Sequence, residues 1–173
     1  GSAGQFLKTD GSKNLSFATV AAPSGTLVSV NEDSTTSETS TTTTNTWTDT
    51  DVSKAVTPAA AANKFLVFWN CHVRLQLDGS DVQGFGKVRL IRDSTALNEA
   101  HMNVVNGGSG SGSGAIVGLS NTIWDHPNTT SEVTYKLQFY LNSQQSGNTM
   151  IFNWDAWGFS APGSKLTIVE FKQ

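Results

Sequence analysis

The side chains that could do chemistry in this 173-residue chain do not fall into a catalytic pattern. The histidines His72, His101 and His126 lie far apart, and no H-x-H or HExxH spacing offers two ligands to a metal ion. No GxSxG turn is present to hold a serine nucleophile, and the glycine-rich stretch 107–114 lacks the Lys-Ser/Thr that a phosphate-binding loop needs. We therefore predict that the protein is not an enzyme and that it holds no metal ion or cofactor.

Two pairs of carboxylates leave one enzymatic alternative open. Asp49 and Asp51 form one close pair, and Asp78 and Asp81 form another. Such carboxylates can bind Ca²⁺, or they can hydrolyse a glycosidic bond when they lie about 5–10 Å apart in a groove. Aspartates near turns more often shape the reversal of the backbone, and we expect that role here. A fragment of a polysaccharide-degrading spike remains the alternative.

Tryptophan beside polar residues gives the clearest signal for recognition. Trp124 is followed directly by Asp125 and His126, and Trp157 lies close to the turn at Pro162. A sugar packs its C–H face on an aromatic ring while polar side chains bind its hydroxyl groups. We predict a ligand site made of Trp124, Asp125, His126 and Trp157. The alternative is that the two tryptophans fill the end of the fold or a contact between subunits.

The elements that must position these residues are β-strands. Apolar residues recur at every second position over 65–77, 133–142 and 149–156, and in the first segment polar residues alternate with them from Asn70 on. This is the period of a strand with one buried face. Trp69 and Trp154 occupy apolar positions of this pattern, so we expect both in the core. Cys71 does too, which favours a buried thiol over a reactive one. Shorter strands are predicted at 26–31, 38–48, 52–57, 85–92, 98–104, 115–121 and 165–171.

Composition agrees with an all-β fold. Only 14% of the residues are charged, and Ser, Thr, Asn and Gly replace the residues that solvent-exposed helices favour. About ten short strands separated by Gly- and Asn-containing turns predict an antiparallel, jelly-roll-like β-sandwich. We assign residues 1–25 to a short connecting segment and residues 26–173 to the sandwich. The stretch 107–114 is predicted to be a loop.

Charge and hydropathy exclude several classes of partner. The net charge is −3 and no basic run is present, which argues against nucleic acid. No stretch is apolar enough to insert into a membrane, and the first residues lack the pattern of a signal peptide. Because the chain starts at Gly1 and not at Met, we expect it to be a fragment of a longer protein.

The sequence pattern of residues 4–18 predicts a miniature hairpin with a turn at Asp10-Gly11. This segment resembles an element of phage tail-fibre and tail-spike proteins, GQ-x-L-x-x-DG-x-x-N-L-x-W, with Phe17 in place of the Trp. The matching residues are Gly4, Gln5, Leu7, Asp10, Gly11, Asn14 and Leu15. Residues 134–140 and 163–170 resemble the end of trimeric tip domains in marine phage fibres. The sequences of these strands are also similar to those of jelly rolls of the tumour-necrosis-factor and C1q type.

The resemblance implies a phage tail-fibre structural protein whose C-terminal tip is a homotrimer. Such a tip would be part of the virion, contact other tail proteins, and bind a bacterial surface receptor, expected to be a polysaccharide. We predict that Tyr135, Leu137, Phe139 and Tyr140 contact the other subunits. Two alternatives stay open: a domain that trimerises and caps the fibre without binding a receptor, and a secreted C1q-like module that binds carbohydrate.

Overall fold

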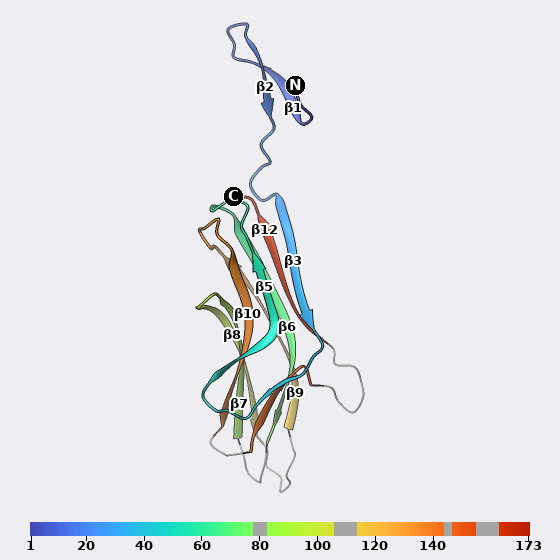
Figure 1. The fold of residues 1–173 in the computed structure, drawn as a ribbon, viewed down its shortest axis with the longest axis vertical. Helices are drawn as coiled ribbons and strands as arrows, with labels where there is room; N and C mark the ends of the chain where they lie inside the picture. The colour runs from blue at the N-terminus through green and yellow to red at the C-terminus, as the bar shows by residue number, and fades with distance from the viewer. Residues whose placement is uncertain (78–82, 106–113, 144–146, 155–162) are drawn as a thin grey trace.

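The computed structural model describes residues 1–77, 83–105, 114–143, 147–154 and 163–173, and all regular structure in these ranges is β-strand (Figure 1). No helix in the described ranges is long and apolar enough to cross a membrane. The strands are β1 (Gln5–Thr9), β2 (Leu15–Thr19), β3 (Leu27–Thr35), β4 (Thr39–Thr41), β5 (Trp47–Val56), β6 (Lys64–Gln76), β7 (Gln83–Arg92), β8 (Thr95–Val105), β9 (Gly114–Asp125), β10 (Val133–Ser143), β11 (Thr149–Phe152) and β12 (Ser164–Phe171).

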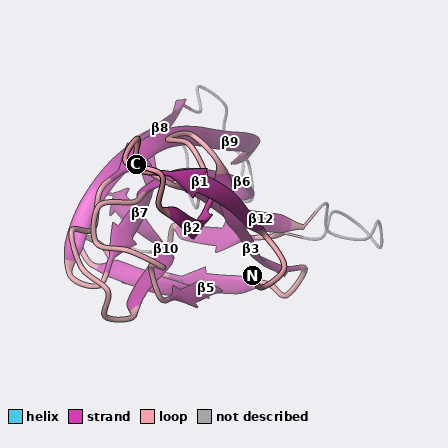
Figure 2. Ribbon diagram, turned by 90° about the horizontal axis from the view of Figure 1, so that it is seen from above, coloured by secondary structure: helices cyan, strands magenta, loops and turns pink. Residues whose placement is uncertain are grey.

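Two antiparallel sheets face each other and form a sandwich (Figure 2). One sheet has the order β5-β10-β7-β8, and the other has the order β3-β12-β6-β11-β4, with β9 on the free side of β6. The long strand β6 pairs with β12 along its first half and with β11 along its second half. The main pairs are nested, because β7 pairs with β8, β6 with β9, β5 with β10 and β3 with β12. This rolled ribbon is a jelly roll, which confirms the predicted fold class.

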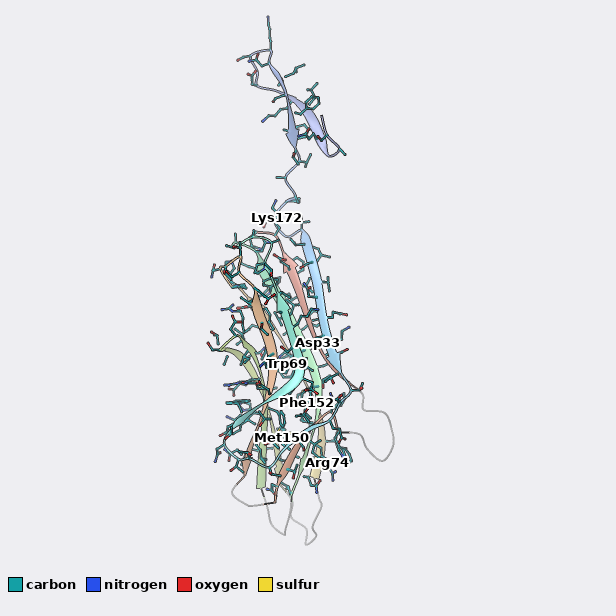
Figure 3. All side chains as sticks on the ribbon, in the orientation of Figure 1. Asp33, Trp69, Arg74, Met150, Phe152 and Lys172 are labelled. Carbon is teal, nitrogen blue, oxygen red and sulfur yellow. The ribbon has the colours of Figure 1, made fainter. Side chains whose placement is uncertain are left out.

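The core lies between the two sheets, and its strands have the predicted alternation. From Phe65 in β6 to Leu77 just after it, the odd-numbered side chains are buried and the even-numbered ones are half-buried or exposed. Trp69 is buried as predicted, and Figure 3 shows it with Met150 and Phe152 in the sandwich. Full burial of a large apolar side chain contributes about 1.5–3 kcal/mol. Such side chains along β6, β10 and β12 therefore hold the two sheets together.

The prediction of subunit contacts is wrong for three of its four residues. Tyr135, Leu137 and Phe139 point from β10 into the core and have no exposed surface in the single chain. The reason is that these residues lie on the inner face of β10, where Tyr135 packs on Phe65 and Phe139 packs on Phe152 of the opposite sheet. Tyr140 faces outward and is half-buried.

The alternation predicted over 149–156 stops earlier than expected. Strand β11 ends at Phe152, and Asn153 takes a left-handed backbone conformation with φ of 57°. Its side-chain amide donates to the carbonyl oxygen of Thr35 at 2.9 Å, and its backbone N–H donates to that of His72 at 2.8 Å. Trp154 is consequently half-buried instead of in the core, and the Arg74 guanidinium lies 4.1 Å from its ring centre.

The N-terminal hairpin β1–β2 stands apart from the sandwich in Figure 1. The chain enters the sandwich beside its own C-terminal strand. There the backbone N–H of Gly25 donates to the carbonyl of Lys172 at 2.7 Å, and the N–H of Lys172 donates to Thr26 at 2.9 Å. Figure 3 labels Lys172 at this junction. The hairpin and the end of β12 therefore lie at the same end of the sandwich.

The single cysteine provides a test of the core. Cys71 is 1% exposed, and burial raises the pKa of its thiol to about 12. Because only a thiolate reacts with alkylating reagents, we expect labelling at pH 8 to be at least a hundredfold slower in the native protein than in denaturant. Mass spectrometry of samples quenched over time measures both rates. Rapid labelling of the native protein would contradict the described core.

Candidate functional site

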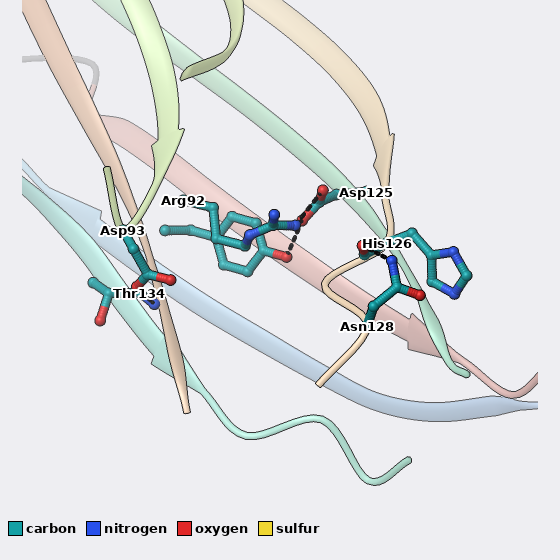
Figure 4. Close-up of polar contacts among 7 residues, drawn as sticks. Arg92, Asp93, Asp125, His126, Asn128 and Thr134 are labelled. Atoms are coloured by element: carbon teal, nitrogen blue, oxygen red, sulfur yellow. Dashed lines mark hydrogen bonds and ion pairs between the residues drawn. The ribbon is translucent and has the colours of Figure 1, made fainter. Parts of the chain in front are cut away.

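The predicted ligand residues do not converge on one surface. Trp124 and Asp125 are neighbours in β9, so their side chains point to opposite faces of the sheet. Trp124 is 57% exposed on the outer face, whereas Asp125 points inward toward Arg92 (Figure 4). The His126 Nε2 lies 3.0 Å from the carbonyl oxygen of Ala62 and can donate to it. Trp157 lies outside the described residues.

The Asp125 carboxylate joins the two sheets. Arg92 in β7 donates from Nη1 to both carboxylate oxygens at 2.6 Å, and the Tyr135 hydroxyl in β10 donates to Oδ2 at 2.6 Å. The side chain of Asp125 is 9% exposed and that of Arg92 is 19% exposed. Burial, together with the hydrogen bond to Asp125, raises the pKa of the Tyr135 phenol. Three hydrogen bonds within the fold engage this carboxylate, which favours a structural role over ligand binding.

A pocket of about 380 Å³ adjoins Trp124 and is lined by Lys64, Trp124, Asp125, His126 and Gln173. It lies near the C-terminus, at the hairpin end of the sandwich. A second pocket of about 480 Å³ lies over β3 and β12 and is lined by Ser34, Thr35, Thr36, Asn70, Gly163, Ser164 and Lys165. Neither pocket is lined by a pair of carboxylates, and no group of three or more His, Cys, Asp or Glu that could hold a metal ion occurs among the described residues.

The predicted aspartate pairs have different outcomes. Asp49 and Asp51 lie inside β5 and not at a turn, so the expected turn role is wrong for them. The Asp49 carboxylate accepts hydrogen bonds from the Gln138 amide at 2.6 Å and from the Lys136 ammonium at 2.7 Å. These two bonds, the one from Gln138 first, lower the pKa of Asp49. Asp78 and Asp81 lie outside the described residues.

Asp49 belongs to an aromatic and polar cluster on the outer face of the four-stranded sheet, here called the Trp47 cluster. Its members are Trp47, Asp49, Arg89, Lys136, Gln138 and Tyr140. The rings of Trp47 and Tyr140 lie 5.0 Å apart, and the guanidinium of Arg89 lies 3.9 Å from the Trp47 ring centre. Arg89 also donates from Nε to Gln138 at 2.9 Å. Rings surrounded by both donors and acceptors can bind a saccharide.

The outer face of the six-stranded sheet has the opposite character. Val30, Val169, Leu66 and Trp124 form one row across four adjacent strands, because Val169 pairs with Val30 and Leu66, and Leu66 pairs with Trp124. Phe68 and Phe171 lie in the neighbouring rows, and the rings of Phe171 and Trp124 are 5.5 Å apart. These six residues are called the apolar patch below. Leu66 and Phe68 occupy outward positions of β6, where the alternation calls for polar residues. These two residues are thus a sign of the patch that the sequence alone contains.

The hairpin also exposes apolar side chains. Leu7 pairs with Phe17, and Thr9 pairs with Leu15, so Leu7, Leu15 and Phe17 share one face. All three are exposed in the single chain. The hairpin thus has no cover for its apolar face among the described residues of its own chain.

Comparisons with known proteins identify no family. No family model matches the chain, and no curated protein matches it. Among solved structures, the chain is similar to that of infectious bursal disease virus strain Gx, with 11% identity and a TM-score of 0.34 over 93% of this chain. The VP2 subviral particle of that virus gives 11% identity and a TM-score of 0.35 over 92%. The chain spans about two fifths of the length of these proteins (39% and 40%), and no conclusion about function follows from so loose a similarity.

The structural role of Asp125 can be separated from a ligand role by substitution. We expect Asp125→Asn to lower the free energy of unfolding by about 2 kcal/mol or more, because it leaves the Arg92 guanidinium without its anion. The control Asp51→Asn changes an exposed side chain and should stay within about 0.5 kcal/mol. Urea denaturation at one fixed protein concentration measures both. Unchanged stability of Asp125→Asn would return this carboxylate to the list of ligand candidates.

Proposed function

We propose that this protein is a virion structural protein, the homotrimeric C-terminal tip of a phage tail fibre. The observation that carries the proposal is the hairpin with its exposed apolar face, attached at one end of an elongated sandwich (Figure 1). A two-stranded hairpin of this size is at best marginally stable in water on its own. It is the kind of segment that needs other chains around it, as in the shaft of a fibre.

The local geometry of the hairpin supports the resemblance to fibre proteins. Asp10 accepts hydrogen bonds from the backbone N–H of Ser12 at 2.7 Å and from the Asn14 amide at 2.8 Å. Gly11 has φ of 84°, which glycine adopts without strain. The polar positions of the motif thus shape the turn, while Leu7 and Leu15 are left exposed for contacts outside the chain. This division of roles explains why the motif combines these residue types.

For the host-facing surface, we propose the Trp47 cluster in place of the predicted Trp124 site. The Trp47 cluster lies on the side of the sandwich, away from the apolar patch. The Trp124 pocket, in contrast, lies at the hairpin end, where the fibre shaft would approach. A polysaccharide receptor suits this mixture of rings, carboxylate, amide and cations. Weak contacts from three copies, and from several fibres, would add through effective concentration.

The rival functions differ in measurable ways. A capping domain would form the trimer but bind no polysaccharide. A secreted carbohydrate-binding module would bind sugar as a monomer. A polysaccharide-degrading enzyme would shorten its substrate, which needs a suitably spaced carboxylate pair in a groove.

The first test is the mass of the full chain in solution. Light scattering on size exclusion should give about three times the chain mass of 18.4 kDa, because three copies can bury the exposed apolar surface of hairpin and sheet. A monomer across the accessible concentrations would contradict the fibre-tip proposal and favour the secreted module.

Receptor binding can be tested on an array of purified bacterial surface polysaccharides. We expect the wild-type chain to bind at least one of them, and Trp47→Ala to weaken that binding at least tenfold through loss of ring stacking, equal to about 1.4 kcal/mol. The variant Trp124→Ala tests the ligand site predicted from the sequence. Its mass in solution must equal that of the wild type, so that any change in binding does not come from a change in oligomeric state. Selective loss in Trp124→Ala would restore that site, and no binding by the wild type would favour the capping domain.

A further inference from the structure

The apolar patch is contiguous because the strand register aligns it. Val30, Val169, Leu66 and Trp124 lie side by side on four neighbouring strands, and strands in a sheet are spaced about 4.8 Å apart. This row alone spans about 14 Å. Val30 is 53% exposed and Trp124 is 57% exposed, so the row is open to solvent in the single chain. Large contiguous apolar surfaces of this kind mark sites of association.

On β6 this face becomes polar farther from the hairpin, whereas the neighbouring β9 still exposes Ile116 there. Along β6, the outward positions that follow Phe68 are Asn70, His72 and Arg74. Beside Asn70, Lys165 makes a 2.8 Å ion pair with Glu32. An apolar centre with a polar rim is the usual anatomy of a protein–protein contact.

The outer face of the four-stranded sheet lacks this character. There Lys136, Asp49, Gln138 and Arg89 are joined by hydrogen bonds, and Tyr140 donates to Asn45 at 3.0 Å. These polar groups hydrogen-bond to one another in the single chain, and the exposed Phe85 lies near the start of β7. Tyr140, predicted to contact other subunits, belongs to this face.

We infer that copies of this chain meet through the apolar patch on the outer face of the six-stranded sheet. The inference rests on the proposed trimer and goes further by assigning its contact surface. The occupant is inferred to be a copy of this chain because Phe171 of the patch directly precedes Lys172, whose backbone bonds to Gly25 and Thr26, where the chain leads from the hairpin into the sandwich. Two exposed apolar surfaces of the chain therefore lie at the same end of the sandwich. The nearest charges in the rows of the patch are Lys64, beside Phe171, and Glu32, which is already paired with Lys165.

A matched pair of substitutions tests the surface in the full chain. Phe68 is 39% exposed on the six-stranded sheet, and Phe85 is 41% exposed on the four-stranded sheet. We expect Phe68→Ser to raise the concentration at which the trimer forms at least tenfold, since buried aromatic anchors dominate interfaces. Phe85→Ser should match the wild type. Light scattering over a dilution series measures all three proteins.

The outcomes separate this inference from the proposed function. A trimeric wild type with an equally stable Phe68→Ser trimer overturns the contact surface and leaves the fibre-tip proposal standing. A monomeric wild type overturns both the fibre-tip proposal and the inferred contact surface. Protection of Cys71 from alkylation reports whether each variant keeps its fold. If Phe68→Ser loses that protection, Val30→Asp in β3 decides by the same criteria, because its side chain is exposed.

Discussion

Each strand of a sandwich has two faces, and the opposite sheet can cover only one of them. The rest of this structure follows from how the uncovered faces are treated. On the outer face of the four-stranded sheet, polar side chains of the Trp47 cluster hydrogen-bond to one another. On the six-stranded sheet, the row from Val30 to Trp124 stays apolar and open. The two outer faces of one domain therefore differ in character, since one is polar and internally hydrogen-bonded and the other is apolar and exposed.

The strands could be predicted from the sequence because alternation depends only on neighbouring residues. Segments such as 65–77 and 133–142 carry the period of a half-buried strand, and the structure confirms them. Alternation does not tell which face another sheet covers. Tyr135, Leu137 and Phe139 were therefore predicted at a subunit contact although they lie in the core. That assignment needs the order of strands in the sheet, which local pattern does not contain.

The candidate sites were less predictable for a related reason. Trp124 and Asp125 are adjacent in sequence, yet the pleat sends their side chains to opposite faces. The Trp47 cluster joins three strands that are separated by long stretches of chain, so no local motif announces it. The apolar patch did leave a trace, because Leu66 and Phe68 interrupt the polar positions of β6.

The nested pairing of strands also decides when the sandwich can close. In the sandwich, β3 is synthesised first and β12 last. Because β12 lies between β3 and β6, the six-stranded sheet is complete only after β12 has been made. Nearly all contacts that close the sheet are distant in sequence, and such topologies fold slowly. During synthesis, β3 and β6 emerge from the ribosome long before their shared partner. Their apolar surfaces are thus exposed in the nascent chain until β12 is made. Exposed apolar surface and unpaired strand edges favour wrong pairing between neighbouring nascent chains during that period.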